Sequence, residues 1–178
     1  NDTEYCPEKR LLERICFSEE QRKGCFLRGW VQDPIAERLS GITGHAGVFS
    51  TARDLSRFAS MILNGGELDG QRVLKKETVD MMISPQSPEG KADVRGLGWD
   101  IDSRYSALKG FFFPADSFGH TGYTGTSLWI DPHSKSYVIL LTCRKNLEDN
   151  LAVRALRTGL SNLAGSMFYP DKVIEKGL

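Results

Sequence analysis

The residue types best suited to chemistry gather in one stretch, which reads Gly-His-Thr-Gly-Tyr-Thr-Gly-Thr-Ser over residues 119–127. His120 can carry a charge or a proton, and the hydroxyl of Thr121 can hydrogen-bond to a carboxylate or a carbonyl. Three glycines within one predicted strand are costly unless something lies close against the backbone. The stretch therefore predicts a place where another group approaches the main chain.

Several kinds of site are excluded. A phosphate-binding loop fails because the glycine spacing is off by one and no lysine precedes Thr126. The chain has no Gly-x-Ser-x-Gly nucleophile elbow. A hydrolase pairing Ser127 with His120 is disfavoured, because residues seven apart on one strand point to opposite faces and lie about 23 Å apart at ~3.3 Å per residue. A third comparison is a resemblance: His120-Thr121-Gly122 resembles the Lys-Thr-Gly strand motif of serine β-lactamases and penicillin-binding proteins, with His120 in place of the lysine. Three residues alone match often by chance, so the weight of this resemblance depends on the motifs around it.

Helices are expected around this stretch. Residues 51–54 resemble a capping box that opens a helix, and Asn-Gly-Gly at 64–66 ends it. A second helix fits 75–83. The chain is expected to close with a helix from about 148 to 167, in which one apolar stripe is formed by Leu156, Leu160, Leu163 and Met167.

The second half also predicts a sheet, with strands at 96–101, 118–130 and 137–142. The turn at 131–135 is so short that the two strands it joins must be antiparallel. The expected fold class is α+β, an antiparallel β-sheet flanked by helices.

In this order, the motifs of the chain resemble the C-terminal half of the β-lactamase-related serine hydrolases, the group of class C β-lactamases, DD-peptidases and related esterases. The motifs that carry the resemblance are Gly44-His45-Ala46-Gly47-Val48-Phe49-Ser50-Thr51, Asp54-Leu55, Phe58, Asn64-Gly65-Gly66, Gly96-Leu97-Gly98-Trp99 and Phe118–Ser127. The likeness runs from about Tyr5 to the end of the terminal helix and is weakest at 7–26. It implies a β-lactamase/transpeptidase-like domain of which residues 1–178 are the C-terminal portion, irregular and loop-rich over 1–40 and structured over 41–178.

The resemblance also implies roles for five residues. His120 resembles the family's lysine or histidine that supports the bound substrate and the proton relay electrostatically. Thr121 resembles the hydroxyl that meets the substrate carboxylate or carbonyl, and Gly122 would allow close approach. The N–H of Tyr123 would be one oxyanion donor. His45 faces the cleft or is a loop histidine bonded to backbone, and both readings stay open.

The family's nucleophile lies in Ser-x-x-Lys and its relay tyrosine in Tyr-x-Asn. The chain has no Tyr-x-Asn, and its Ser-x-x-Lys, Ser106 to Lys109, is followed by Gly110 where a helix would have to continue. We therefore expect the nucleophile upstream of Asn1 and no activity from this chain alone. The implied enzyme opens an amide or ester through an acyl-enzyme. The alternative is a non-catalytic binding module that keeps the fold.

The composition of the chain limits the classes of partner that it is expected to bind. The 178 residues carry 23 Lys+Arg and 23 Asp+Glu, and this neutral balance argues against nucleic acid. No apolar run approaches the ~20 residues of a membrane span, and residues 1–4 do not begin a signal peptide. The expected partners are a small-molecule or peptidoglycan-like substrate and the missing N-terminal half. Without that half, one face of the sheet would be exposed, and we expect poor solubility or self-association.

The cysteines lack the spacing of zinc-ligand pairs, so we expect neither a metal nor another cofactor. A disulfide among Cys6, Cys16 and Cys25 is possible if the protein is exported, and Cys143 is expected to be a buried thiol. Cysteine usage does not decide the compartment. The family resemblance favours an extracytoplasmic location, periplasmic or secreted.

Overall fold

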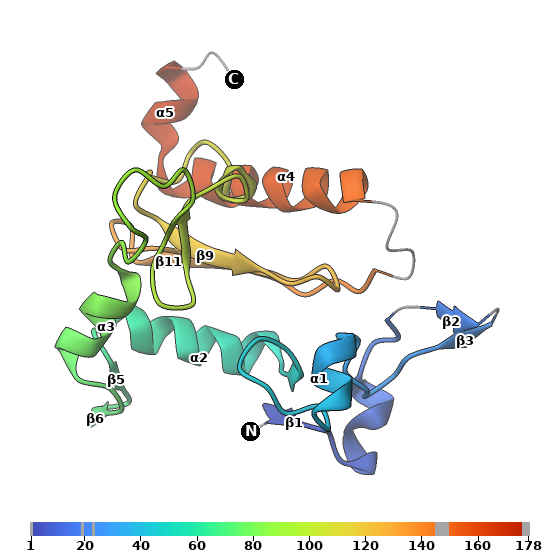
Figure 1. The fold of residues 1–178 in the computed structure, drawn as a ribbon. Coiled ribbons are helices and arrows are strands. Elements are labelled where there is room, and N and C mark those ends of the chain that lie inside the picture. The colour runs from blue at the N-terminus through green and yellow to red at the C-terminus, as the bar shows by residue number, and fades with distance from the viewer. Residues whose placement is uncertain (1, 19, 23, 145–149, 176–178) are drawn as a thin grey trace.

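A five-stranded antiparallel sheet lies at the centre of the molecule, with one helix on each of its faces (Figure 1). The computed structural model describes residues 2–18, 20–22, 24–144 and 150–175. The helices on the two faces are α2 (Ala52–Leu63) and α4 (Asn150–Phe168). The expected α+β arrangement is thus confirmed. The strand order is β11 (Ser136–Leu140), β10 (Ser127–Asp131), β9 (Phe118–Thr121), β8 (Asp100–Asp102) and β7 (Val94–Arg95).

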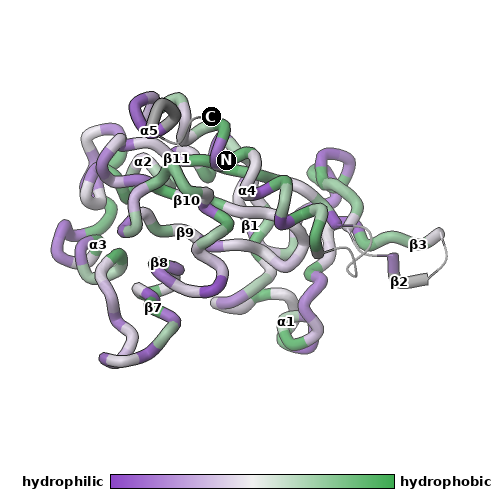
Figure 2. Tube along the Cα trace, turned by 90° about the horizontal axis from the view of Figure 1, so that it is seen from above, coloured by the Kyte–Doolittle hydropathy of each residue, from purple (hydrophilic) through white to green (hydrophobic). Residues whose placement is uncertain are grey.

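The remaining elements are short and lie mostly in the first half of the chain. The β2–β3 hairpin projects away from the rest of the molecule in both views (Figures 1 and 2). These elements are β1 (Glu4–Tyr5), η1 (Lys9–Arg14), β2 (Glu20–Arg22), β3 (Cys25–Phe26), α1 (Pro34–Arg38), β4 (Val48–Phe49), β5 (Glu67–Leu68), β6 (Gln71–Arg72), α3 (Lys76–Ile83), η2 (Ser106–Lys109) and α5 (Pro170–Glu175).

Helix α2 follows the local signals closely. The Thr51 hydroxyl accepts a hydrogen bond from the Asp54 N–H at 3.2 Å and caps the first turn. At the other end the N–H groups of Gly66 and Gly65 donate to the carbonyls of Met61 and Ile62, which is the Schellman pattern. Both glycines have positive φ, 63° at Gly65 and 94° at Gly66, so the chain can reverse here at little steric cost.

The predicted strand at 118–130 is wrong as a single element, because it is a hairpin. β9 and β10 pair antiparallel, with Thr121 opposite Ser127 and Phe118 opposite Ile130. Residues 122–126 form the connection, closed by a hydrogen bond from Gly125 N to Gly122 O, and Gly125 has φ 119°. The 23 Å separation expected between His120 and Ser127 therefore does not apply, although Ser127 is buried.

The predicted strand at 96–101 is also shorter than expected. The N–H of Gly96 donates to Trp99 O at 2.9 Å, and Gly98 has φ 79°. These residues therefore form the turn between β7 and β8, and only 100–102 are extended as strand.

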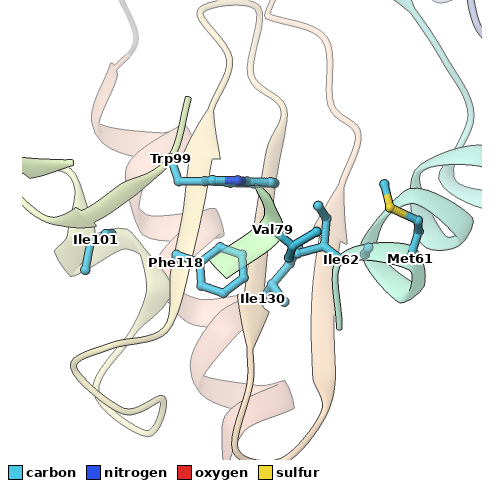
Figure 3. Packing of buried hydrophobic residues seen from close by; sticks show 8 residues of the cluster. Met61, Ile62, Val79, Trp99, Ile101, Phe118 and Ile130 are labelled. Carbon is cyan, nitrogen blue, oxygen red and sulfur yellow. The ribbon is translucent and has the colours of Figure 1, made fainter. Parts of the chain in front are cut away.

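The main core lies between the sheet and α2 (Figure 3). Phe118 and Ile130, opposite each other on β9 and β10, are 1% and 0% exposed. The Trp99 ring meets Phe118 edge-on at 5.2 Å between centroids. Helices α2 and α3 contribute to the same cluster through Ala59, Met61, Ile62 and Val79.

Helix α4 turns the other way from its predicted stripe. Its buried face is formed by Arg157 and by the small residues Ser161 and Gly165. A Cβ on Gly165 would lie 2.6 Å from Phe112. Leu163 and Met167 are 65% and 76% exposed. The expectation of a bare sheet face is therefore wrong. The outside of α4 instead carries exposed apolar side chains, among them Leu163 and Met167.

All four cysteines are free thiols, so the structure holds none of the possible disulfides. The expectation of a buried Cys143 is wrong, since the residue is exposed just beyond the end of β11. The surroundings of its sulfur nevertheless change the pKa of the thiol. Partial burial of the thiol and a hydrogen bond with Cys16 raise the pKa of Cys143 to about 11.

Candidate active site

The candidate site is the end of β9 together with the turn that follows it. His120 and Thr121 pair with Leu128 and Ser127 of β10 on one edge of the strand. On the other edge, β8 meets β9 at a single residue, where Asp100 lies opposite Gly119. Within the described residues no strand covers that edge at 120–121. The backbone there is available to an extended ligand, which could add as a further strand.

His120 lies at this open edge and is exposed. Its Nδ1 lies 2.9 Å from the carbonyl oxygen of Thr121. A carbonyl can only accept, so in this hydrogen bond Nδ1 carries the proton. In the neutral ring this leaves Nε2 as the basic nitrogen, able to accept a proton or a hydrogen bond from a substrate.

The turn at 122–126 carries Tyr123, which follows the end of β9 by two residues. Gly122 N donates to Thr126 O at 2.8 Å, and Gly125 N donates to Gly122 O at 3.1 Å. The Tyr123 side chain is 64% exposed. Among the hydrogen bonds of the described residues, none uses the N–H of Tyr123. This donor is therefore free to meet a developing negative charge.

The carbonyl groups of the turn are held from behind by side chains distant in sequence. Arg157 of α4 donates through Nη2 to Gly122 O at 2.7 Å and to Thr126 O at 2.8 Å. Arg144 donates through Nη1 to Tyr123 O at 3.0 Å, and its guanidinium lies 5.5 Å from the Tyr123 ring centroid. Charge-assisted hydrogen bonds thus hold three carbonyl groups of the turn.

Neither arginine was identified from the sequence. Arg157 shares its helical face with Ser161 and Gly165, four and eight residues on. A stripe of small residues next to an arginine was the available signal for the inward face of α4. Its targets, 31 to 35 residues earlier in the chain, leave no local pattern.

Gly119 and Gly122 are required by packing within the chain. A Cβ on Gly119 would lie 2.3 Å from Leu128 O and from the Trp129 ring. A Cβ on Gly122 would lie 2.2 Å from the Thr126 hydroxyl oxygen. The close approach expected at these positions is therefore present, but the group that approaches belongs to the neighbouring strand or turn.

His45 lies on the glycine-rich turn before β4 and is exposed. Its Nε2 is 3.0 Å from Asp33 Oδ1, so its partner is a carboxylate and not the backbone. Asp33 also caps α1 by accepting from the N–H groups of Ile35 and Ala36. The Ala36 N–H and the His45 side chain lower the pKa of Asp33. No hydrogen bond among the described residues joins His45 to residues 120–123.

Ser106 and Lys109 are both buried in η2, and both bond to the same main-chain oxygen. Ser106 Oγ donates to Ile101 O at 3.1 Å, and Lys109 Nζ donates to the carbonyls of Ile101, Ala115 and Ser117 at 3.3, 2.6 and 2.9 Å. Burial lowers the pKa of Lys109. This geometry gives the pair a structural task, tying η2 to the start of β9.

Asp131 is a second buried polar centre, at the far end of the β10–β11 hairpin. Its carboxylate accepts from the Ser117 and Ser134 hydroxyls, from the Tyr169 hydroxyl and from the His133 N–H. Through Tyr169, these contacts join the hairpin to the junction between α4 and α5. Within the described ranges, no group of three or more His, Cys, Asp or Glu side chains could hold a metal ion, and no helix could cross a bilayer.

The sequence of this chain is similar to those of known bacterial proteins. Two bacterial proteins named "Putative D-alanyl-D-alanine carboxypeptidase", from Salmonella typhi and Salmonella newport (strain SL254), are each 33% identical over 105 residues. The match covers 58% of this chain and 24% of each relative, so the chain spans about a quarter of their length.

Solved structures share the fold at low sequence identity. A β-lactamase from Mycobacterium bovis superimposes with a TM-score of 0.56 at 21% identity, covering 76% of this chain and 54% of that one. Simvastatin synthase from Aspergillus terreus superimposes with a TM-score of 0.62 at 14% identity, covering 94% and 46%. The family model described as Beta-lactamase matches residues 15–161, most of the sequence. The chain therefore belongs to the Beta-lactamase family.

Proposed function

We propose that the chain forms one wall of the active site of a serine hydrolase that cleaves an amide or an ester through an acyl-enzyme. The observation that carries the proposal is the open edge of β9 at His120 and Thr121, followed directly by the uncommitted N–H of Tyr123. An extended substrate added to this edge would bring a carbonyl toward that N–H. An oxyanion donor belongs at such a point.

In the proposed reaction, a serine hydroxyl attacks the substrate carbonyl and passes its proton to a base. The carbonyl oxygen becomes negative, and the Tyr123 N–H stabilises it as one of two donors. The amine or alcohol leaves with a proton, and water then opens the acyl-enzyme to release the acid and the serine. The nucleophile, its lysine and the relay tyrosine would come from Ser-x-x-Lys and Tyr-x-Asn motifs outside this chain.

His120 and Thr121 would hold the substrate during these steps. Thr121 would hydrogen-bond to a carboxylate or carbonyl of the substrate. His120, with its proton on Nδ1, offers Nε2 to the substrate or to the proton relay, and becomes a cation when Nε2 takes a proton. Three substrate classes fit this chemistry: β-lactams, peptides ending in D-Ala-D-Ala, and carboxylic esters. The names of the Salmonella relatives favour the peptide.

The test uses the protein encoded by the complete reading frame that contains this chain. It is incubated with a fluorescent penicillin, and the covalent adduct is located by peptide mass spectrometry. We expect an adduct on a serine outside the chain, weakened about tenfold or more in rate by Thr121→Ala. Ser106→Ala is the matched control and should still be labelled.

Two outcomes would overturn the proposal. One is an adduct on Ser106. The other is a folded protein that turns over none of the three substrate classes and forms no adduct. If that protein still binds a D-Ala-D-Ala peptide, for instance by calorimetry, the chain belongs to a non-catalytic binding module.

A further inference from the structure

A charged side chain in the middle of α4 is devoted to the backbone of the β9–β10 turn. Arg157 is 7% exposed. Its Nη2 donates to Gly122 O at 2.7 Å and to Thr126 O at 2.8 Å, and its buried Nε has no hydrogen-bond partner among the described residues. The side chain is therefore aimed at two carbonyls and leaves one of its own donors unsatisfied.

Burying a guanidinium is costly unless other groups compensate for the lost water. No carboxylate among the described residues forms an ion pair with Arg157. Burial and the neighbouring cations Arg144 and Arg154 lower the pKa of Arg157, so its charge is not stabilised by an acid. The compensation comes from the two main-chain carbonyls. Such a cost is hard to explain by α4 packing alone, because a neutral side chain would fill the space more cheaply.

The first of these carbonyls has a special position in the chain. The C=O of Gly122 and the N–H of Tyr123 belong to one planar trans peptide group, in which the two bonds point in opposite directions. Since Arg157 binds the oxygen from the α4 side, the N–H is directed away from α4. A cation on the oxygen also polarises the peptide and makes its N–H a stronger donor.

We propose that Arg157 is a positioning residue that orients and polarises the Tyr123 N–H as an oxyanion donor; this rests on the proposed function. Arg144 holds the following peptide through Tyr123 O, so the Tyr123 residue is anchored on both sides. The turn is thereby prevented from rotating when charge develops on the substrate. Preorganisation of this kind needs no rearrangement during the reaction.

The experiment compares Arg157→Gln and Arg157→Lys with Arg154→Gln, an exposed arginine one turn earlier on the same helix, in the complete protein. The first readout is the 1H–15N resonance of the Tyr123 amide in protein labelled with 15N-tyrosine, assigned by its loss in Tyr123→Phe. We expect R157Q to move this proton upfield and R157K to restore part of the shift. R154Q should leave it in place.

The second readout is steady-state ester hydrolysis. R157Q should lower kcat about tenfold to a hundredfold with KM changed less than twofold, because the lost stabilisation acts on the transition state. A folded R157Q with an unchanged Tyr123 amide, or with a kcat equal to that of R154Q, overturns the proposal. If R157Q does not fold, R157K decides by the same two readouts. A wild-type protein without hydrolase activity refutes the proposed function, whereas the amide resonance still reports on positioning.

Discussion

The indole ring of Trp129 occupies the space that a side chain on Gly119 would need. The two residues face each other across the β9–β10 ladder, and a Cβ on Gly119 would lie 2.3 Å from the ring and from Leu128 O. Trp129 is 1% exposed and cannot move aside without disturbing the face of the sheet covered by α4. A glycine before His120 is thus a condition for pairing β9, the strand of the candidate site, with β10.

Gly119→Ala should accordingly destabilise the protein. Overpacking in a tightly filled region costs about 1–3 kcal/mol, and urea unfolding should show a loss of this size. The matched control is Gly159→Ala, where the added Cβ meets nothing within 4 Å on the outside of α4. That variant should gain about 0.5–1 kcal/mol, since alanine is the better helix former. Equal effects of the two substitutions would contradict the packing argument.

Thr51→Ala should weaken the first turn of α2. The hydroxyl accepts from the Asp54 N–H at 3.2 Å, and loss of such a cap costs about 0.5–2 kcal/mol. Thermal unfolding should show a lower Tm for Thr51→Ala. Thr51→Ser retains the oxygen and should unfold close to the wild-type temperature. A Thr51→Ser variant as unstable as the alanine variant would mean that the methyl group, and not the cap, matters.

Asp131 should make stability depend on acid pH. Burial by itself raises the pKa of this carboxyl, but hydrogen bonds from Ser134, Tyr169 and the His133 N–H outweigh it, so the net pKa is lowered. A lowered carboxyl pKa stabilises the fold above the unfolded value of 3.8, and this contribution is lost as pH falls through the folded pKa. Urea unfolding should therefore show wild-type stability falling below about pH 4.

Asp131→Asn should remove that part of the acid dependence. At pH 7 it should cost about 1–3 kcal/mol, because an amide cannot accept from all of these donors. Asp69→Asn is the control, since Asp69 forms an exposed ion pair with Arg57 and should change stability by less than about 1 kcal/mol. If D131N kept the full wild-type acid dependence, the carboxylate would not be its source.

Cys143 should react slowly with alkylating agents despite its exposure. With a pKa of about 11, the Cys143 thiol is ionised in only a small fraction of molecules at pH 8.5. An ordinary cysteine is about half ionised at this pH. Because a more basic thiolate is also the better nucleophile, the net effect should be about tenfold slower reaction with iodoacetamide, followed by mass spectrometry. Cys25 is the internal reference. Cys16→Ala should shift the rate profile of Cys143 to lower pH, and an unchanged profile would refute the coupling of the two thiols.

The parts of the fold that the sequence predicts are those with local signals. Helix α2 has a cap at Thr51 and glycines at 65–66, and the turn before β11 is marked by proline and polar residues. The hairpin inside 118–130 was missed because its turn residues, Gly122 to Gly125, continue the glycine and threonine pattern of the strands themselves. A strand and a tight turn of this composition differ only in φ and ψ.

In the candidate site, too, some residues have a local sequence signal and others do not. His120, Thr121 and Tyr123 are predicted from a short motif, because the proposed chemistry uses residues that are close together in sequence. Arg157 lies 35 residues from Gly122, and its role depends on which face of α4 meets the sheet. The leucines of α4 suggest the opposite face, since an apolar stripe is expected to point inward. Only the three-dimensional packing identifies the arginine.

β9 serves two environments in four residues. Phe118 is fixed among Trp99, Ile130 and α2, and His120 stands two residues further along the same side of the strand. Because only Gly119 separates the two residues, a displacement of the Phe118 backbone would also shift the backbone of His120. If the proposed function holds, the hydrophobic core would therefore set the position of the β9 edge at His120, and substitutions in the core would change substrate selectivity without touching the substrate.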